Sequence, residues 1–257
     1  MKKDENLSLQ KPNNTFAVLL GLLLLVTTLV SVIFLTNPQF DIYIASFFYD
    51  EGNSFPLNNN QFLIQLRLFF NIEIGILCAG SLLMMIFARI NKNMIIPAKL
   101  WDFMLVSFLI GPLLLANVIF KSNWGRARPA NIEEFGGTLT FSPAYYISDQ
   151  CSLNCSFVSG EGSAIATAGI LLGIIAWNIF PKHRSVSIGL IGIISIIGIS
   201  LRIVKGRHFI SDSLLATLFC AIVILLLYHF AKITKIKHKL TLTNLCHDFK
   251  NMFNFKT

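Results

Sequence analysis

Residues 16–35 read FAVLLGLLLLVTTLVSVIFL and contain no charged side chain. A helix needs about 20 mostly apolar residues to cross the hydrocarbon core of a bilayer, so this run is long enough to span a membrane. It exceeds the apolar core of a signal peptide, and no small-residue cleavage pattern follows it. The run is therefore predicted to be a transmembrane helix that the protein retains.

Five more apolar runs of comparable length follow along the chain. They cover residues 66–88, 100–120, 163–180, 186–201 and 211–231. The chain is 54% hydrophobic and only 13% charged, whereas a soluble domain is about 25% charged. These features predict an all-α polytopic membrane protein with six transmembrane helices.

The apolar runs leave little chain for a separate soluble domain. A single membrane domain is therefore predicted over residues 1–257, with an N-terminal tail at 1–15 and a basic tail at 232–257. The net charge of +8 does not point to nucleic acid, because Lys and Arg lie at the edges of the apolar runs. Such positions are typical of residues that set topology and contact anionic lipid. No nucleic-acid partner is expected.

The basic residues also predict the orientation in the membrane. Six spans place both termini on one side, together with fourteen of the 21 Lys and Arg residues, so the termini are predicted to be cytoplasmic. Six of the seven remaining cations fall in two short segments on the outer side: Lys121, Arg126, Arg128, Arg202, Lys205 and Arg207. The positive-inside rule disfavours this placement, and a bound anion would explain it.

Three segments of the predicted outer face are candidates for the site: KSNWGRARP at 121–129, NCSFVSGEGS at 154–163 and RIVKGRHFISD at 202–212. Lys121, Arg128 and Arg202 would supply three cationic donors, and two of these are guanidinium groups suited to phosphate oxygens. Ser159 and Gly160 precede a helix, whose N-terminal N–H groups favour an anion. Together these residues predict a phosphate site at the outer face, with all three segments at similar depth.

His208 and Asp212 are four residues apart in the last of these segments. On a helix they would share a face, and in a loop Asp212 could still accept a proton from one ring nitrogen. Either arrangement fixes the imidazole tautomer and leaves the other nitrogen free to attack phosphorus. Each residue alone has a plainer reading, since Lys and Arg often anchor helices at the interface. Taken together, the clustered cations and the neighbouring His–Asp pair favour a catalytic site over this plainer interpretation.

The spacing of these residues resembles the type-2 phosphatidic acid phosphatase superfamily, the membrane relatives of the vanadium haloperoxidases. Lys121, six residues and then Arg128 followed by Pro match the first signature of that superfamily. Arg202, His208 and Asp212 match the third signature, in the expected order. The motifs cover residues 121–212, and the six-helix layout extends the resemblance over most of the chain.

The resemblance implies a role for each matching residue. His208 would be the nucleophile that forms a phosphohistidine, and Asp212 would orient it. The residues that would bind the phosphate are Lys121, Arg128, Arg202, Ser159 and Gly160. The chemistry of the superfamily needs no metal and no other cofactor, so none is expected.

Two positions depart from the pattern of the superfamily. Leu201 stands where the third signature has Ser. The second signature reads Pro-Ser-Gly-His in the superfamily, whereas residues 158–161 read VSGE, so the histidine that acts as general acid is missing. Glu161 is the candidate substitute. Burial would raise its pKa and the neighbouring cations would lower it, and the sequence does not decide between these effects.

The resemblance implies a phosphatase that acts on a membrane lipid phosphate at the periplasmic face of a bacterial inner membrane. The stretch CSLNCSFVSGEGS is most similar to the lipid A phosphatase branch. Polyprenyl pyrophosphate and phosphatidylglycerol phosphate are alternative substrates. A lipid phosphotransferase and a non-catalytic lipid-binding relative are alternative functions. The oligomeric state is left open.

Cys151 and Cys155 are the only closely spaced cysteines among the five. The surrounding sequence offers no further Cys or His ligands, so a metal site is not expected there. A local disulfide is one alternative if the loop faces an oxidising compartment, and two free thiols are the other.

Overall fold

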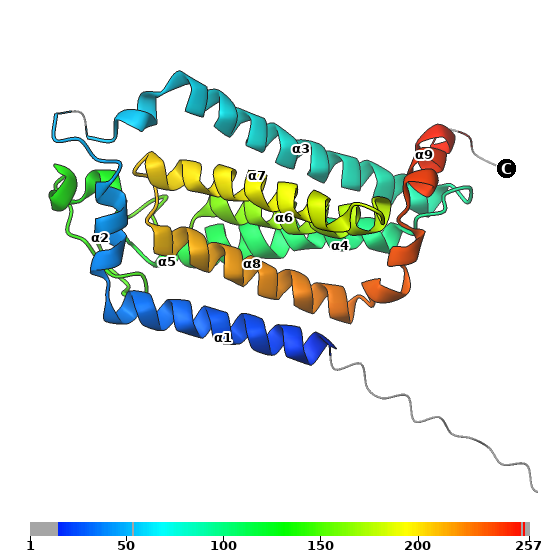
Figure 1. Ribbon diagram of the computed structural model, residues 1–257, viewed down its shortest axis with the longest axis horizontal. Coiled ribbons are helices and arrows are strands. Elements are labelled where there is room, and N and C mark those ends of the chain that lie inside the picture. The colour runs from blue at the N-terminus through cyan, green and yellow to red at the C-terminus, as the bar shows by residue number, and fades with distance from the viewer. Residues whose placement is uncertain (1–14, 53, 253, 255–257) are drawn as a thin grey trace, which may run out of the picture.

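The computed structural model describes residues 15–52, 54–252 and 254, which fold into helices joined by loops (Figure 1). In this part of the chain, six helical segments are long and apolar enough to cross a membrane. They are α1 (Thr15–Thr36), α3 (Gln61–Ile90), the segment Ala98–Asn123, α6 (Gly160–Ile179), α7 (Arg184–Val204) and α8 (Ile210–Phe230). The expected all-α fold with six spans is confirmed. The expected N-terminal tail lies outside the described residues, apart from Thr15.

The third span is irregular in its C-terminal half. It begins as α4 (Ala98–Phe108), continues as the π-helix η2 (Leu109–Phe120) and ends in the short helix α5 (Lys121–Asn123). Pro112 lies inside η2, where its missing N–H disrupts regular α-helical hydrogen bonding. π-Helical turns are rare and occur mostly at functional sites. Here the irregular stretch leads directly to Lys121, the first residue of α5.

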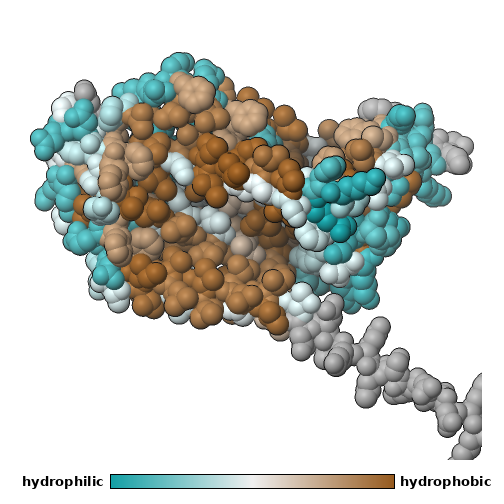
Figure 2. Space-filling model, viewed as in Figure 1, coloured by the Kyte–Doolittle hydropathy of each residue, from teal (hydrophilic) through white to brown (hydrophobic). Residues whose placement is uncertain are grey.

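The outward faces of the spans are apolar. Exposed large side chains on these faces include Leu22, Leu25, Leu29, Ile76, Leu83 and Ile193. Figure 2 shows a broad hydrophobic band between hydrophilic regions at the two ends of the molecule. Exposed apolar surface of this extent marks contact with lipid or another protein, and its position on six spans identifies lipid. The chain is therefore a multi-pass membrane protein.

One end of the helical bundle carries the residues predicted for the site. The last turn of α7, the first turns of α6 and α8, and the long loop after α5 meet there beside α2 (Gln39–Ser46) (Figure 1). A small apolar cluster joins these elements, with Ala45 of α2 packed near Phe55, Phe135 and Phe209. This cluster holds α2 and the loop against the start of α8.

The opposite end of the bundle is closed by the C-terminal segment. This segment contains η5 (Ile233–Lys235), η6 (Lys237–Lys239) and α9 (Leu242–Asn251). Asp248 of α9 is buried and accepts hydrogen bonds from the N–H groups of Ile95 and Ile96, at 2.8 and 2.9 Å. Ile233 and Leu240 are buried in the main core. Residues 232–252 of the segment expected as a basic tail are therefore a folded part of the protein.

Candidate active site

A buried ion-pair network lies beneath the site. The guanidinium of Arg126 donates to Asp41 at 2.8 Å, to Asp212 at 2.5 Å and to the carbonyl of Ser142 at 2.8 Å. The side chains of Arg126, Asp41 and Asp212 are completely buried. Asp41 also accepts hydrogen bonds from the N–H and hydroxyl of Ser211. The charge of Arg126 is thus balanced within the protein. The sequence had grouped Arg126 with the cations whose placement a bound anion would explain.

His208 is held by a backbone carbonyl. Its Nδ1 lies 2.7 Å from the carbonyl oxygen of Ser156 and 3.8 Å from Oδ2 of Asp212. A carbonyl only accepts hydrogen bonds, so Nδ1 carries the proton and Nε2 carries the lone pair. The Ser156 carbonyl is thus the nearest acceptor for this proton, and the carboxylate of Asp212 lies farther from the same nitrogen. Asp212 instead accepts from the hydroxyl of Ser156 at 2.6 Å and from the N–H of Phe209 at 2.9 Å.

The other ring nitrogen of His208 is unoccupied. Among the described residues, Nε2 has no hydrogen-bond partner, and the side chain is only 1% exposed. Burial is the main reason that the pKa of His208 falls to about 4, and the charges of Lys121 and Arg202 lower it further, although Asp212 opposes them. The imidazole is therefore neutral at physiological pH. A neutral imidazole with a free Nε2 has the form that a nucleophile requires.

A polar cavity of about 430 Å³ opens at this end of the bundle. The residues Lys121, Arg128 and Arg202 all line it, so the structure brings together the three cations that the sequence singled out. Glu161 lines it as well. His208 does not, because its ring is buried.

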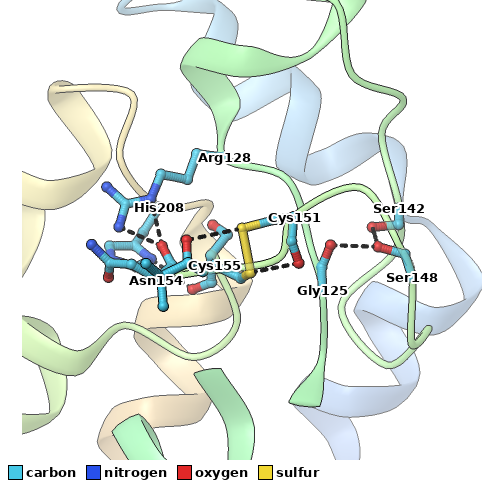
Figure 3. Close-up of a disulfide and its surroundings, with 10 residues drawn as sticks. Gly125, Arg128, Ser142, Ser148, Cys151, Asn154, Cys155 and His208 are labelled. Carbon is cyan, nitrogen blue, oxygen red and sulfur yellow. Dashed lines mark hydrogen bonds between the residues drawn. A yellow bond between two sulfur atoms is a disulfide. The ribbon is translucent and has the colours of Figure 1, made fainter. Parts of the chain in front are cut away.

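Arg128 and Arg202 are held in different ways. Nε and Nη2 of Arg128 both donate to the carbonyl of Asn154, at 3.1 and 2.7 Å (Figure 3). Arg202 lies in the last turn of α7, and its Nη1 is 3.5 Å from Glu161. The buried Nε of Arg202 has no hydrogen-bond partner in the part of the chain that the structure describes. Both guanidinium groups therefore keep donors for an anion.

Glu161 forms an ion pair that the sequence did not reveal. Nε and Nη2 of Arg67, on α3, donate to the two carboxylate oxygens of Glu161 at 2.8 and 2.5 Å. Together with the nearby Arg202, this two-point contact stabilises the ionised carboxylate. In this arrangement Glu161 accepts hydrogen bonds, so it is not poised to donate a proton.

Ser159 and Gly160 serve the structure of the α6 N-terminus. The Ser159 hydroxyl oxygen caps the helix by accepting from the N–H of Gly162 at 3.1 Å. A Cβ atom on Gly160 would lie 2.4 Å from Oδ1 of Asn117 and 3.2 Å from Nζ of Lys121. Glycine thus lets α6 approach the third span closely. Neither Ser159 nor Gly160 lines the cavity.

Cys151 and Cys155 form a disulfide in the loop that precedes α6 (Figure 3). Asn154, whose carbonyl accepts from Arg128, lies inside this small disulfide loop. The disulfide therefore constrains the segment that holds Arg128. In the described part of the chain, His, Cys, Asp and Glu side chains form no group of three that could hold a metal ion.

These features define a helical membrane protein with a cationic cavity next to a buried, neutral histidine. The chain belongs to the PAP2 superfamily, since the model of that superfamily matches residues 100–235, which include every residue of the predicted motifs. It is therefore a membrane phosphatase of this superfamily. No solved structure matches the chain.

Three relatives share the same description, lipid A 4'-phosphatase. The protein of Francisella tularensis subsp. novicida is 32% identical over 216 residues, which are 80% of this chain and 90% of that protein. The protein of Rhizobium leguminosarum is 40% identical over 113 residues, 44% of this chain and 46% of its own length. The protein of Rhizobium etli is 42% identical over 107 residues, 41% of this chain and 40% of its own length.

Proposed function

We propose that this chain removes a phosphate from lipid A, with His208 as the nucleophile. The observation that carries the proposal is the free, buried Nε2 of His208 beside Lys121 and Arg202. The three relatives described as lipid A 4'-phosphatases support the choice of lipid and point to its 4'-phosphate.

In the first step, Nε2 of His208 attacks phosphorus, and the bond from phosphorus to the lipid oxygen breaks. The imidazole gains positive charge, which the nearby carboxylate of Asp212 stabilises across 3.8 Å. Lys121, Arg128 and Arg202 stabilise the negative charge on the phosphoryl oxygens. Because His208 is buried and does not line the cavity, the side chains that cover its ring must move before the phosphate reaches Nε2.

The departing lipid oxygen needs a proton. Glu161 was the candidate donor, but its ion pair with Arg67 supports an ionised carboxylate. We therefore assign the donation to water, and we assign Glu161 to positioning Arg67 and Arg202. In the second step, water attacks the phosphohistidine, releases inorganic phosphate and restores the neutral imidazole. As proposed, neither step requires a metal, which the chelator in the assay below tests.

The disulfide supports a periplasmic site. Disulfides persist in oxidising compartments, and the bacterial periplasm is one of them, whereas the cytosol keeps thiols reduced. Cys151 and Cys155 lie at the same end of the bundle as the cavity, as Figure 3 shows for Cys151, Arg128 and His208. The distribution of Lys and Arg favours the same orientation, with cytoplasmic termini.

A substrate panel tests the proposed function. The purified full chain in detergent would be given lipid A, phosphatidic acid, phosphatidylglycerol phosphate and polyprenyl pyrophosphate, with excess chelator present. We expect phosphate release from lipid A that survives chelation, and a lipid product that lacks its 4'-phosphate. Faster phosphate release from another lipid would identify that lipid, rather than lipid A, as the substrate. Transfer of the phosphate to a second lipid, seen in the products, would identify a phosphotransferase instead.

A further inference from the structure

The cavity holds more positive charge than one phosphate can balance. Its cationic lining residues are Arg67, Lys121, Arg128, Arg202, Lys205 and Arg207. Glu161 is the one acidic residue in the lining of this cavity, and it is paired with Arg67. A phosphate ester carries about −1.5 to −2 charge at neutral pH, which the three cations assigned to catalysis already balance. The charges of Lys205 and Arg207 are therefore not balanced by this one phosphate.

Lys205 is largely covered by the fold, and none of the described carboxylates pairs with it. Its side chain is 4% exposed, and it forms no hydrogen bond or ion pair with any residue that the structure describes. Burial lowers the pKa of its ammonium group, and the charges of Arg67 and Arg202 lower it further. Lys205 lines the cavity beside these cations, so an anion supplied by a ligand would stabilise its charge.

Arg207 extends the cationic surface beyond the main cavity, past Arg128. It lines the main cavity and also a neighbouring cavity of about 210 Å³. Gly206 lies between Arg207 and Lys205 with a φ of +62°, a left-handed conformation that favours glycine. This turn lets both cations face one cavity although they are only two residues apart. The pair is therefore built into the α7–α8 connection.

We propose that Lys205 and Arg207 form a second anion subsite, which binds another phosphate on the headgroup that His208 attacks. The inference rests on the proposed function and narrows its substrate to lipids with two separate phosphates. A cavity of about 430 Å³ is the size of sites for drug-sized ligands and exceeds what a diphosphate fills. The amides of Asn58 and Asn59 also line it and suit the hydroxyl groups of a sugar.

Binding to a catalytically inactive variant tests the subsite. The full chain carrying His208→Ala would be titrated with one glycolipid in three forms: with two separate phosphates, with only the phosphate to be removed, and with a diphosphate at that position. We expect the first form to bind about tenfold more tightly than either of the others. Adding Arg207→Gln or Lys205→Gln should bring this ratio close to one, and Lys205→Arg should preserve it.

Lys182 provides a matched control. It is an exposed cation in the loop between α6 and α7, at the other end of the bundle, so Lys182→Gln should leave the binding ratio unchanged. Equal binding of the one- and two-phosphate forms would overturn the subsite, and so would tight binding of the diphosphate form. Turnover by the wild-type protein, measured in parallel, tests the proposed function separately. If the wild type releases phosphate but the one- and two-phosphate forms bind equally well, only the subsite is rejected. If the two-phosphate form binds more tightly but the wild type releases no phosphate, only the phosphatase function is rejected.

Discussion

Arg126 and Arg128 are two residues apart, yet their charges meet opposite environments. Arg126 is fully buried between the carboxylates of Asp41 and Asp212. Arg128 lines the cavity, and among the described residues it donates only to the carbonyl of Asn154. A guanidinium whose charge is balanced inside the protein stabilises the fold, whereas one left unbalanced beside a cavity is available to an anion.

The same contrast separates two layers of the site. In the lower layer, the buried acids and Arg126 satisfy one another and fix the start of α8, where Asp212 accepts from the N–H of Phe209. In the upper layer, Lys121, Arg202 and their neighbours line an open cavity with a single carboxylate. His208 lies at the boundary, with Nδ1 bound to the Ser156 carbonyl and Nε2 free.

Removing the charge of Arg126 should have the largest effect. Arg126→Gln leaves Asp41 and Asp212 buried without a counter-charge, and breaking a buried pair in this way typically costs about 3–5 kcal/mol. We expect a large drop in the thermal unfolding temperature of the detergent-solubilised protein. Arg128→Gln is the matched control and should unfold close to the wild-type temperature. Equal destabilisation by the two substitutions would contradict the contrast between the layers.

Arg128→Gln should instead lower catalysis. The substitution removes a charged donor that stabilises the transferring phosphoryl group, and loss of such a donor typically costs about 10²–10³ in kcat. Steady-state phosphate release from the preferred lipid measures this effect. A kcat within threefold of wild type would remove Arg128 from the catalytic residues.

Glu161→Gln separates two roles for the carboxylate. If Glu161 only positions Arg67 and Arg202, the isosteric amide should lower kcat by less than about tenfold, because Gln can still accept from Arg67. A general acid would be worth about 10²–10⁴. Arg67→Gln is the paired variant and should have an effect of similar size to Glu161→Gln. A fall of 10³ in kcat for Glu161→Gln alone would restore the proton-donor role.

The pH dependence should show the smallest effect. His208 must be neutral to attack phosphorus, and burial lowers its pKa to about 4. Protonation of this group therefore removes activity only as the pH falls through about 4, and kcat/KM should change little on its account between about pH 5 and pH 7. The pH profile of kcat/KM measures this. An acid limb centred near the ordinary histidine pKa of about 6.5 would place His208 in contact with water.

The sequence predicts the features that depend on local pattern. Long, mostly apolar runs predict the six spans, and fixed spacing predicts that Lys121, Arg128 and Arg202 share one site. It does not predict Asp41 or Arg67, whose partners lie 85 and 94 residues away along the chain. Arg67 falls near the start of an apolar run, where it is indistinguishable from an interfacial anchor.

Two other features escape sequence reasoning for physical reasons. The carbonyl that holds His208 belongs to the backbone of Ser156, and a backbone acceptor leaves no signature in the sequence. The C-terminal segment is rich in Lys, which suggests a solvated tail, but Ile233 and Leu240 anchor it in the core. Its folding depends on where these few apolar side chains meet the rest of the bundle.

If His208 attacks phosphorus, it becomes covalently phosphorylated, and this phosphohistidine can be trapped. The purified chain would react briefly with lipid A that carries radiolabelled phosphate and be quenched in alkali, in which phosphohistidine survives. We expect label on the protein, located at His208 by mass spectrometry and absent from His208→Ala. Rapid turnover by the wild type without labelled protein, or turnover that persists in His208→Ala, would contradict it.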